Sequence, residues 1–129
     1  MALLHEEVTS KILEAFYGVY NELGCGFLEK AYENAMLIEL ARLGLSPQAQ
    51  VPIKVYFRGQ LVGDYIADIV VNGCVIVELK ACETINKAHA AQLINYLKAT
   101  AIDVGLLLNF GNKPDFERRV CETMRSDPR

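Results

Sequence analysis

The stretch VIVELKA, from Val75 to Ala81, predicts a β-strand inside the protein, yet it carries two opposite charges. Alternate residues of a strand point to the same face, so Glu78 and Lys80 leave this strand on one side. A charge among buried apolar neighbours is costly unless it is paired or bound to a metal ion. The pair therefore indicates either a polar site cut into the sheet or a Glu–Lys ion pair on a solvated strand face.

The preceding stretch, LVGDYIADIVV (Leu61–Val71), predicts a neighbouring strand, and Asn72-Gly73 predicts a hairpin between the two. An aspartate and a glutamate on adjacent strands make a hard oxygen site suited to Mg²⁺ or Mn²⁺. A two-residue turn, however, would set Asp68 opposite Val77 and send Asp68 and Glu78 to opposite faces. A shared metal ion therefore requires an odd-length loop or a bulge near Asp68, and we predict such an irregularity.

The whole pattern predicts an α/β fold, with a mixed four-stranded sheet flanked by helices. Pro52 indicates an edge position for the first strand, and the last strand, apolar on both faces, is expected to be central. The helix between the third and fourth strands suits a crossover between parallel strands. Helices are expected at His5–Leu23, Phe27–Leu43, Ile85–Thr100 and Pro114–Arg125, and strands at Val51–Phe57, Leu61–Val71, Cys74–Ala81 and Asp103–Phe110.

Composition limits the class of protein. The chain has 129 residues, 52% of them hydrophobic and 22% charged, which is typical of a globular domain rather than a disordered chain. No apolar run is long enough to cross a membrane, and Met1–Thr9 does not resemble a signal peptide, so we expect a cytoplasmic protein without membrane contact. Its four cysteines lack metal-binding spacing and are expected to be buried thiols. The net charge of −3 offers no broad basic surface for nucleic acid.

Polar residues on two predicted helices add candidates for a site. Glu29 shares a helical stripe with Tyr32 and is expected to lean toward the interior, although a glutamate in a first turn also complements the helix dipole. His89, Gln92 and Tyr96 form a polar stripe that borders the apolar face of the third helix. Tyr96 also fits a half-buried core aromatic, and Gln92 an ordinary surface residue.

In this order the features resemble the PD-(D/E)XK nuclease superfamily, whose restriction-endonuclease-like core is αβββαβ. More narrowly, GFLEKAY (Gly26–Tyr32), IAD (Ile66–Asp68), VIVELKA and AQLINYLKAT (Ala91–Thr100) are together similar to a small bacterial and archaeal group named the GxxExxY proteins. The resemblance extends from the first helix to GLLLNFG. It implies that residues 1–129 form a single nuclease-like domain.

The resemblance also implies roles for the matching residues. Asp68 and Glu78 would ligate Mg²⁺ (or Mn²⁺), the carbonyl of Leu79 would add a contact, and Glu29 would bring a further acidic group to the metal site. Lys80 would lie beside the attacking water.

Other matching positions would support this site. Gln92 and Tyr96 would line the cleft, with His89 on the same stripe, and would touch phosphate or hold the lysine in place. Ala67 stands where the proline of the motif's name would be, and Cys25 stands where relatives commonly have proline.

Two classes of function follow. The hypothesis we favour is an enzyme, a metal-dependent phosphodiesterase that cuts DNA or RNA. The alternative is a non-catalytic nuclease-fold module acting in partner binding or assembly, which the acidic balance favours. A homodimer is a further hypothesis, because Tyr17 and Tyr20 lie outside the main apolar stripe of the first helix, although ordinary packing also explains them.

Overall fold

The computed structural model describes residues 4–121, whose elements follow the order ααβββαββ. The helices are α1 (Glu6–Leu23), α2 (Glu29–Arg42) and α3 (Lys87–Ala99). The strands are β1 (Pro47–Phe57), β2 (Gln60–Val71), β3 (Val75–Lys80), β4 (Val104–Phe110) and β5 (Pro114–Val120). The order predicted from the sequence is confirmed as far as β4, although β1 begins at Pro47 rather than at Val51.

The strands form one mixed sheet in the order β1-β2-β3-β4-β5, so it holds five strands rather than the predicted four. β3 and β4 are parallel and joined through α3, and the other neighbouring pairs are antiparallel. β1 lies at an edge, as Pro52 predicts, and β4 lies between two strands with all its residues buried. These positions confirm the crossover and the central strand.

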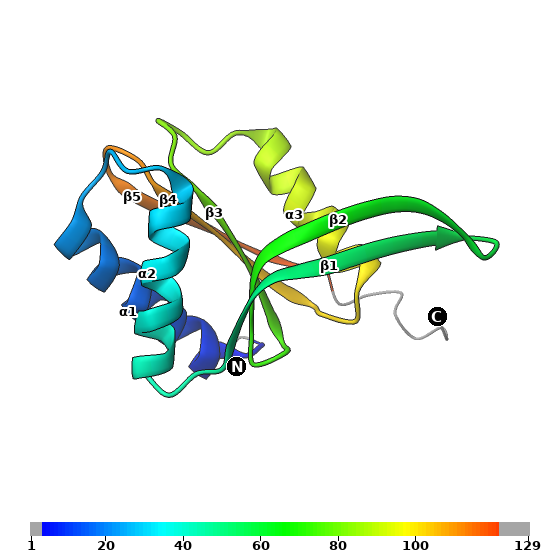
Figure 1. The fold of residues 1–129 in the computed structure, drawn as a ribbon, viewed down its shortest axis with the longest axis horizontal. Helices are drawn as coiled ribbons and strands as arrows, with labels where there is room; N and C mark the ends of the chain where they lie inside the picture. Colours follow the sequence, from blue (N-terminus) through cyan, green and yellow to red (C-terminus); the bar gives the residue numbers. More distant parts are fainter. Residues whose placement is uncertain (1–3, 122–129) are drawn as a thin grey trace.

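Helices cover both faces of the sheet, with α1 and α2 on one face and α3 on the other (Figure 1). Apolar residues at helical spacing face the sheet, among them Phe16 of α1, Met36 of α2 and Leu93 of α3, each fully buried. Burying a side chain of this size contributes about 1.5–3 kcal/mol. Figure 1 also shows β1 and β2 continuing as a two-stranded ribbon beyond the rest of the sheet, beside α3.

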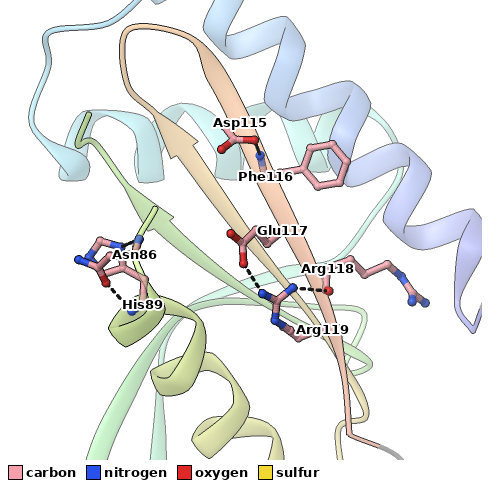
Figure 2. Close-up of polar contacts among 7 residues, drawn as sticks. All are labelled: Asn86, His89, Asp115, Phe116, Glu117, Arg118 and Arg119. Carbon is pink, nitrogen blue, oxygen red and sulfur yellow. Dashed lines mark hydrogen bonds and ion pairs between the residues drawn. The ribbon is translucent and has the colours of Figure 1, made fainter. Parts of the chain in front are cut away.

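The helix predicted from Pro114 to Arg125 is wrong as far as Val120, where the structure has β5, and its remainder lies outside the described residues after Cys121. β5 pairs with β4 over the whole length of both strands and satisfies backbone groups that would otherwise lie at an open edge. Its side chains alternate: Phe116 packs with the α1 and α2 cluster, while Glu117 and Arg119 form an ion pair on the other face (Figure 2).

Two further expectations from composition have different outcomes. Among residues 4–121, no helix is both long enough and apolar enough to span a membrane. The four cysteines are free thiols, but the expectation that they are buried is wrong, because Cys25 is exposed and the others are partly exposed.

Candidate active site

The loop between β2 and β3 has the odd length that a shared site requires. Val71 pairs with Val75, so three residues, Asn72 to Cys74, form the turn. Asn72 and Gly73 both have positive φ, 53° and 65°, a conformation that asparagine and glycine adopt most readily. Ile69 pairs with Val77, and the same register brings the next residues, Asp68 and Glu78, opposite each other. The predicted irregularity is confirmed.

At this point the two carboxylates replace the hydrogen bonds of the strand ladder. The backbone N–H of Asp68 donates to Glu78 Oε2 at 2.8 Å, and the backbone N–H of Leu79 donates to Asp68 Oδ2, also at 2.8 Å. Regular pairing of β2 with β3 ends at Ile69 and Val77. The strands therefore separate at Asp68 and Glu78, and each carboxylate is fixed by the backbone of the opposite strand.

At the same position, the side chains of β2 change the face of the sheet toward which they point. Ala67 and Ile69 are two residues apart in one strand, yet Ile69 packs with the α1 and α2 cluster and Ala67 with the α3 cluster. On β1, the register brings Gln50 opposite Asp68, and Gln50 has a positive φ of 56°. The change of face thus occurs through Asp68 and Gln50, where β2 leaves the main sheet.

Burial and mutual repulsion act strongly on the acidic pair. Glu78 is only 4% exposed, and burial, followed by the charge of Asp68, raises its pKa to about 8. Burial also raises the pKa of Asp68, with further contributions from Glu33 and Glu29. Lys80 opposes both shifts, so its ammonium lies near the pair. One cation does not offset these carboxylates, and both resist ionisation where they stand.

This deficit of positive charge, together with the donor set, fits a hard divalent cation. Mg²⁺ usually takes one or two carboxylates and keeps several waters, and Asp68 and Glu78 provide two. Within residues 4–121, no group of three or more His, Cys, Asp or Glu side chains is arranged to hold a metal ion. Two carboxylates with water as the remaining ligands would make an open, partly hydrated site.

Glu29 lies at the start of α2 and is exposed, so the expectation that it leans into the interior is wrong. The helix begins at Glu29 itself, and this side chain stays exposed although Tyr32, three residues further along, is fully buried. Even so, the charge of Glu29 raises the pKa of both Asp68 and Glu78. Its carboxylate therefore lies within electrostatic range of the pair.

Residues of α3 contribute unequally. Tyr96 is buried, and its pKa is raised by burial and then by the charges of Glu78 and Asp68, so its phenol lies close to the pair. Gln92 is exposed and lines a groove together with Tyr96. His89 serves in the N-terminal cap of α3: its backbone N–H donates to Asn86 Oδ1, and its Nδ1 accepts from the backbone N–H of Asn86 (Figure 2).

A hydrogen-bond network around the buried Glu33 was missed by sequence reasoning. Glu33, which is 5% exposed, accepts hydrogen bonds from Lys30 Nζ at 2.8 Å and from Gln50 Nε2 at 2.7 Å. Glu33 thereby links α2 to Gln50, which lies opposite Asp68 on β1. A signal was present, because Glu33 shares helical spacing with the buried Met36, but Gln50 carries no comparable pattern.

Two further side chains hold the backbone around the site. The carboxamide of the buried Asn109 accepts from the N–H of Cys82 at 3.0 Å and donates to its carbonyl at 2.9 Å, which fixes the chain just beyond Lys80. The hydroxyl of Tyr32 donates to the carbonyl of Gly24 at 2.6 Å and accepts from the N–H of Phe27 at 3.2 Å. This second clamp fixes the turn that leads to Glu29.

A family model of the PD-(D/E)XK nuclease superfamily matches residues 6–120, and the chain therefore belongs to that superfamily. No curated protein sequence matches the chain.

A solved structure supports the architecture. The crystal structure of SSO0001 superposes with a TM-score of 0.56 at 13% sequence identity, covering 71% of this chain and 50% of that one. At this identity the likeness concerns the fold alone. The match spans half the length of that protein.

Proposed function

We propose that the protein is a Mg²⁺- or Mn²⁺-dependent nuclease that hydrolyses phosphodiester bonds of DNA or RNA. The observation that carries the proposal is the pair Asp68 and Glu78, opposite each other where β2 and β3 separate, with the pKa of Glu78 raised to about 8. Membership of the PD-(D/E)XK superfamily supports a nucleic-acid substrate.

In this proposal Asp68, Glu78 and the carbonyl of Leu79 hold the ion, and Glu29 contributes through its nearby charge. The bound ion would supply Lewis-acid stabilisation of charge on the phosphate. The ammonium of Lys80, close to both carboxylates, would donate a hydrogen bond to the attacking water or to a phosphate oxygen. Gln92 and Tyr96 would orient the phosphate from α3. Water adds across the P–O ester bond, and the leaving oxygen takes up a proton.

We further propose that the chain is one of the GxxExxY proteins. The supporting residues are Gly26, Glu29 and Tyr32. Gly26 has a φ of 110°, which L side chains rarely adopt, and Tyr32 clamps the turn before Glu29. The spacing of the motif thus corresponds to a turn, an acidic residue and the clamp that holds the turn in place.

A cleavage assay tests the proposed function. Purified protein is incubated with single-stranded DNA, duplex DNA and RNA in Mg²⁺, in Mn²⁺ and in EDTA. We expect metal-dependent cleavage of at least one substrate, and a loss of about 100-fold or more in Asp68→Ala and in Lys80→Ala. Asp64→Ala is the matched control, because Asp64 lies exposed on the same strand and pairs with Lys54 across the ribbon. Cleavage that survives both site substitutions would contradict the proposal.

The alternative, a nuclease-fold module without catalysis, is favoured by the net charge of −3. It predicts no uptake of divalent ions. Calorimetry that detects micromolar Mn²⁺ binding in the wild type, and none in Glu78→Gln, would exclude this alternative.

A further inference from the structure

A groove lies between the β1–β2 ribbon and α3, two elements that Figure 1 shows side by side. Its volume is about 680 Å³, within the range of about 300–1,000 Å³ that ligand sites occupy. The ribbon contributes Gly63 and Tyr65, and α3 contributes Gln92, Asn95, Tyr96 and Lys98. The rest of the lining is alanine and valine, which leaves the groove wide.

The groove lies beside the candidate active site. Tyr65 of the lining stands three residues before Asp68 on β2, and Tyr96 packs in one cluster with Ala67, the neighbour of Asp68. A ligand that lies along the groove therefore comes toward the strand segment that carries Asp68.

Tyr65 offers the groove an accessible aromatic face. It is 47% exposed, and its ring centroid lies 5.9 Å from that of Tyr96 at an angle of 41°. The ring lies across Gly63, where a Cβ atom would come within 2.7 Å of it. Contact with Gly63 on one side and Tyr96 on another holds the ring in place while leaving part of it open to a ligand.

The polar groups of the groove suit nucleobases better than a charged duplex backbone. Gln92 and Asn95 are exposed carboxamides, which pair with the edges of bases. Among the described residues that line the groove, Lys98 is the one charged side chain. Duplex binding relies on many lysine and arginine contacts to phosphate, and neither this groove nor a chain of net charge −3 supplies them.

We propose that this groove binds an unpaired strand of nucleic acid, with a base against Tyr65 and the backbone leading to Asp68 and Glu78. The inference rests on the proposed nuclease function, and it specifies the substrate as single-stranded. Unpaired bases present their faces for stacking, which a duplex does not. The outer end of the ribbon carries two further exposed aromatic residues, Tyr56 and Phe57.

Binding is measured without cleavage, by fluorescence anisotropy in Ca²⁺ buffer. The probes are labelled oligothymidine and oligouridine of about 15 nucleotides and a duplex of equal length. We expect the wild type to bind a single strand more tightly than the duplex, Tyr65→Ala to weaken this binding by about 5- to 100-fold, and Tyr65→Phe to retain it. Tyr17→Ala is the matched control: it removes a tyrosine that is 38% exposed on α1, which covers the opposite face of the sheet.

Salt dependence provides a second measurement. The slope of log K against log salt should be shallow in the wild type, at about −0.7 for each phosphate contacted, and Lys98→Gln should reduce its magnitude by about 0.7. Unchanged affinity in Tyr65→Ala, or duplex bound as tightly as single strand, would overturn the inference. So would light scattering in which Tyr65→Ala dissolves a dimer while oligonucleotide affinity stays the same, since the groove would then be an interface between two copies.

The same variants separate this inference from the proposed function. Cleavage that is normal in Tyr65→Ala would leave the nuclease in place and remove the groove from substrate binding. Tyr65-dependent binding of single strands without any cleavage would support the groove and contradict the enzyme.

Discussion

The carboxamide of Gln50 on β1 donates to Glu33 of α2 at 2.7 Å. Gln50 lies opposite Asp68, so this bond joins α2 to the strand position beside the acidic pair. Glu33 is almost fully buried, and its second oxygen accepts from Lys30. Through the bond between Gln50 and Glu33, α2 fixes the position at which β1 and β2 leave the main sheet, next to Asp68.

We therefore predict that Gln50→Ala weakens both the fold and the site. Removing one partner of a buried charged group typically costs about 1–3 kcal/mol, so the free energy of unfolding in urea should fall by that amount. Gln48→Ala is the control, because Gln48 is an exposed residue of the same strand. Equal stability of the two variants would show that the bond to Glu33 contributes nothing.

A second prediction concerns Asn109, whose carboxamide holds both backbone groups of Cys82. Asn109→Ala should reduce the free energy of unfolding by about 1–3 kcal/mol and speed amide hydrogen exchange in the segment after Lys80. Asn34→Ala, at an exposed position of α2, should change neither quantity. If exchange at Cys82 is the same in both variants, the proposed clamp is not acting.

A third prediction follows from the pKa of Glu78. Because the folded state raises this pKa from 4.5 to about 8, the folded protein binds more protons than the unfolded chain between these values. In EDTA, the contribution of Glu78 to the free energy of unfolding should therefore be fully present below about pH 4.5. It should be lost as the pH rises toward 8. The slope can reach about 1.4 kcal/mol per pH unit for one group.

Thermal unfolding from pH 5 to 9 measures this effect as the difference between the wild type and Glu78→Gln, which lacks the titrating carboxyl. Mn²⁺ should flatten the decline in the wild type, since a bound cation favours the ionised form. Parallel curves for the two proteins in EDTA would mean that Glu78 titrates near its ordinary value.

Much of this arrangement was accessible from the sequence because it depends on short periodicities. The two-residue spacing of Glu78 and Lys80, and the parity argument from Asp68, led to the odd-length loop that the structure has. The helical spacing likewise predicted α1, α2 and α3, and on α2 it is right for the buried Tyr32 but wrong for Glu29.

Other features depend on contacts between distant parts of the chain. The segment PDFERRV of β5 has only two strongly apolar side chains, Phe116 and Val120, and becomes a strand because β4 offers it an unpaired edge. Glu33 and Gln50 meet only after α2 and β1 have packed together. The exposure of Glu29 depends on where α2 begins, and boundaries of helices are the least certain part of a sequence pattern.

The central claim is that Asp68 and Glu78 share one metal ion, and anomalous diffraction from crystals soaked in Mn²⁺ tests it most directly. The account predicts an anomalous peak between the two carboxylates, at about 2.0–2.2 Å from an oxygen of each, that is absent from crystals of Glu78→Gln treated in the same way. Wild-type crystals without a peak there, or with Mn²⁺ bound only elsewhere, would contradict it.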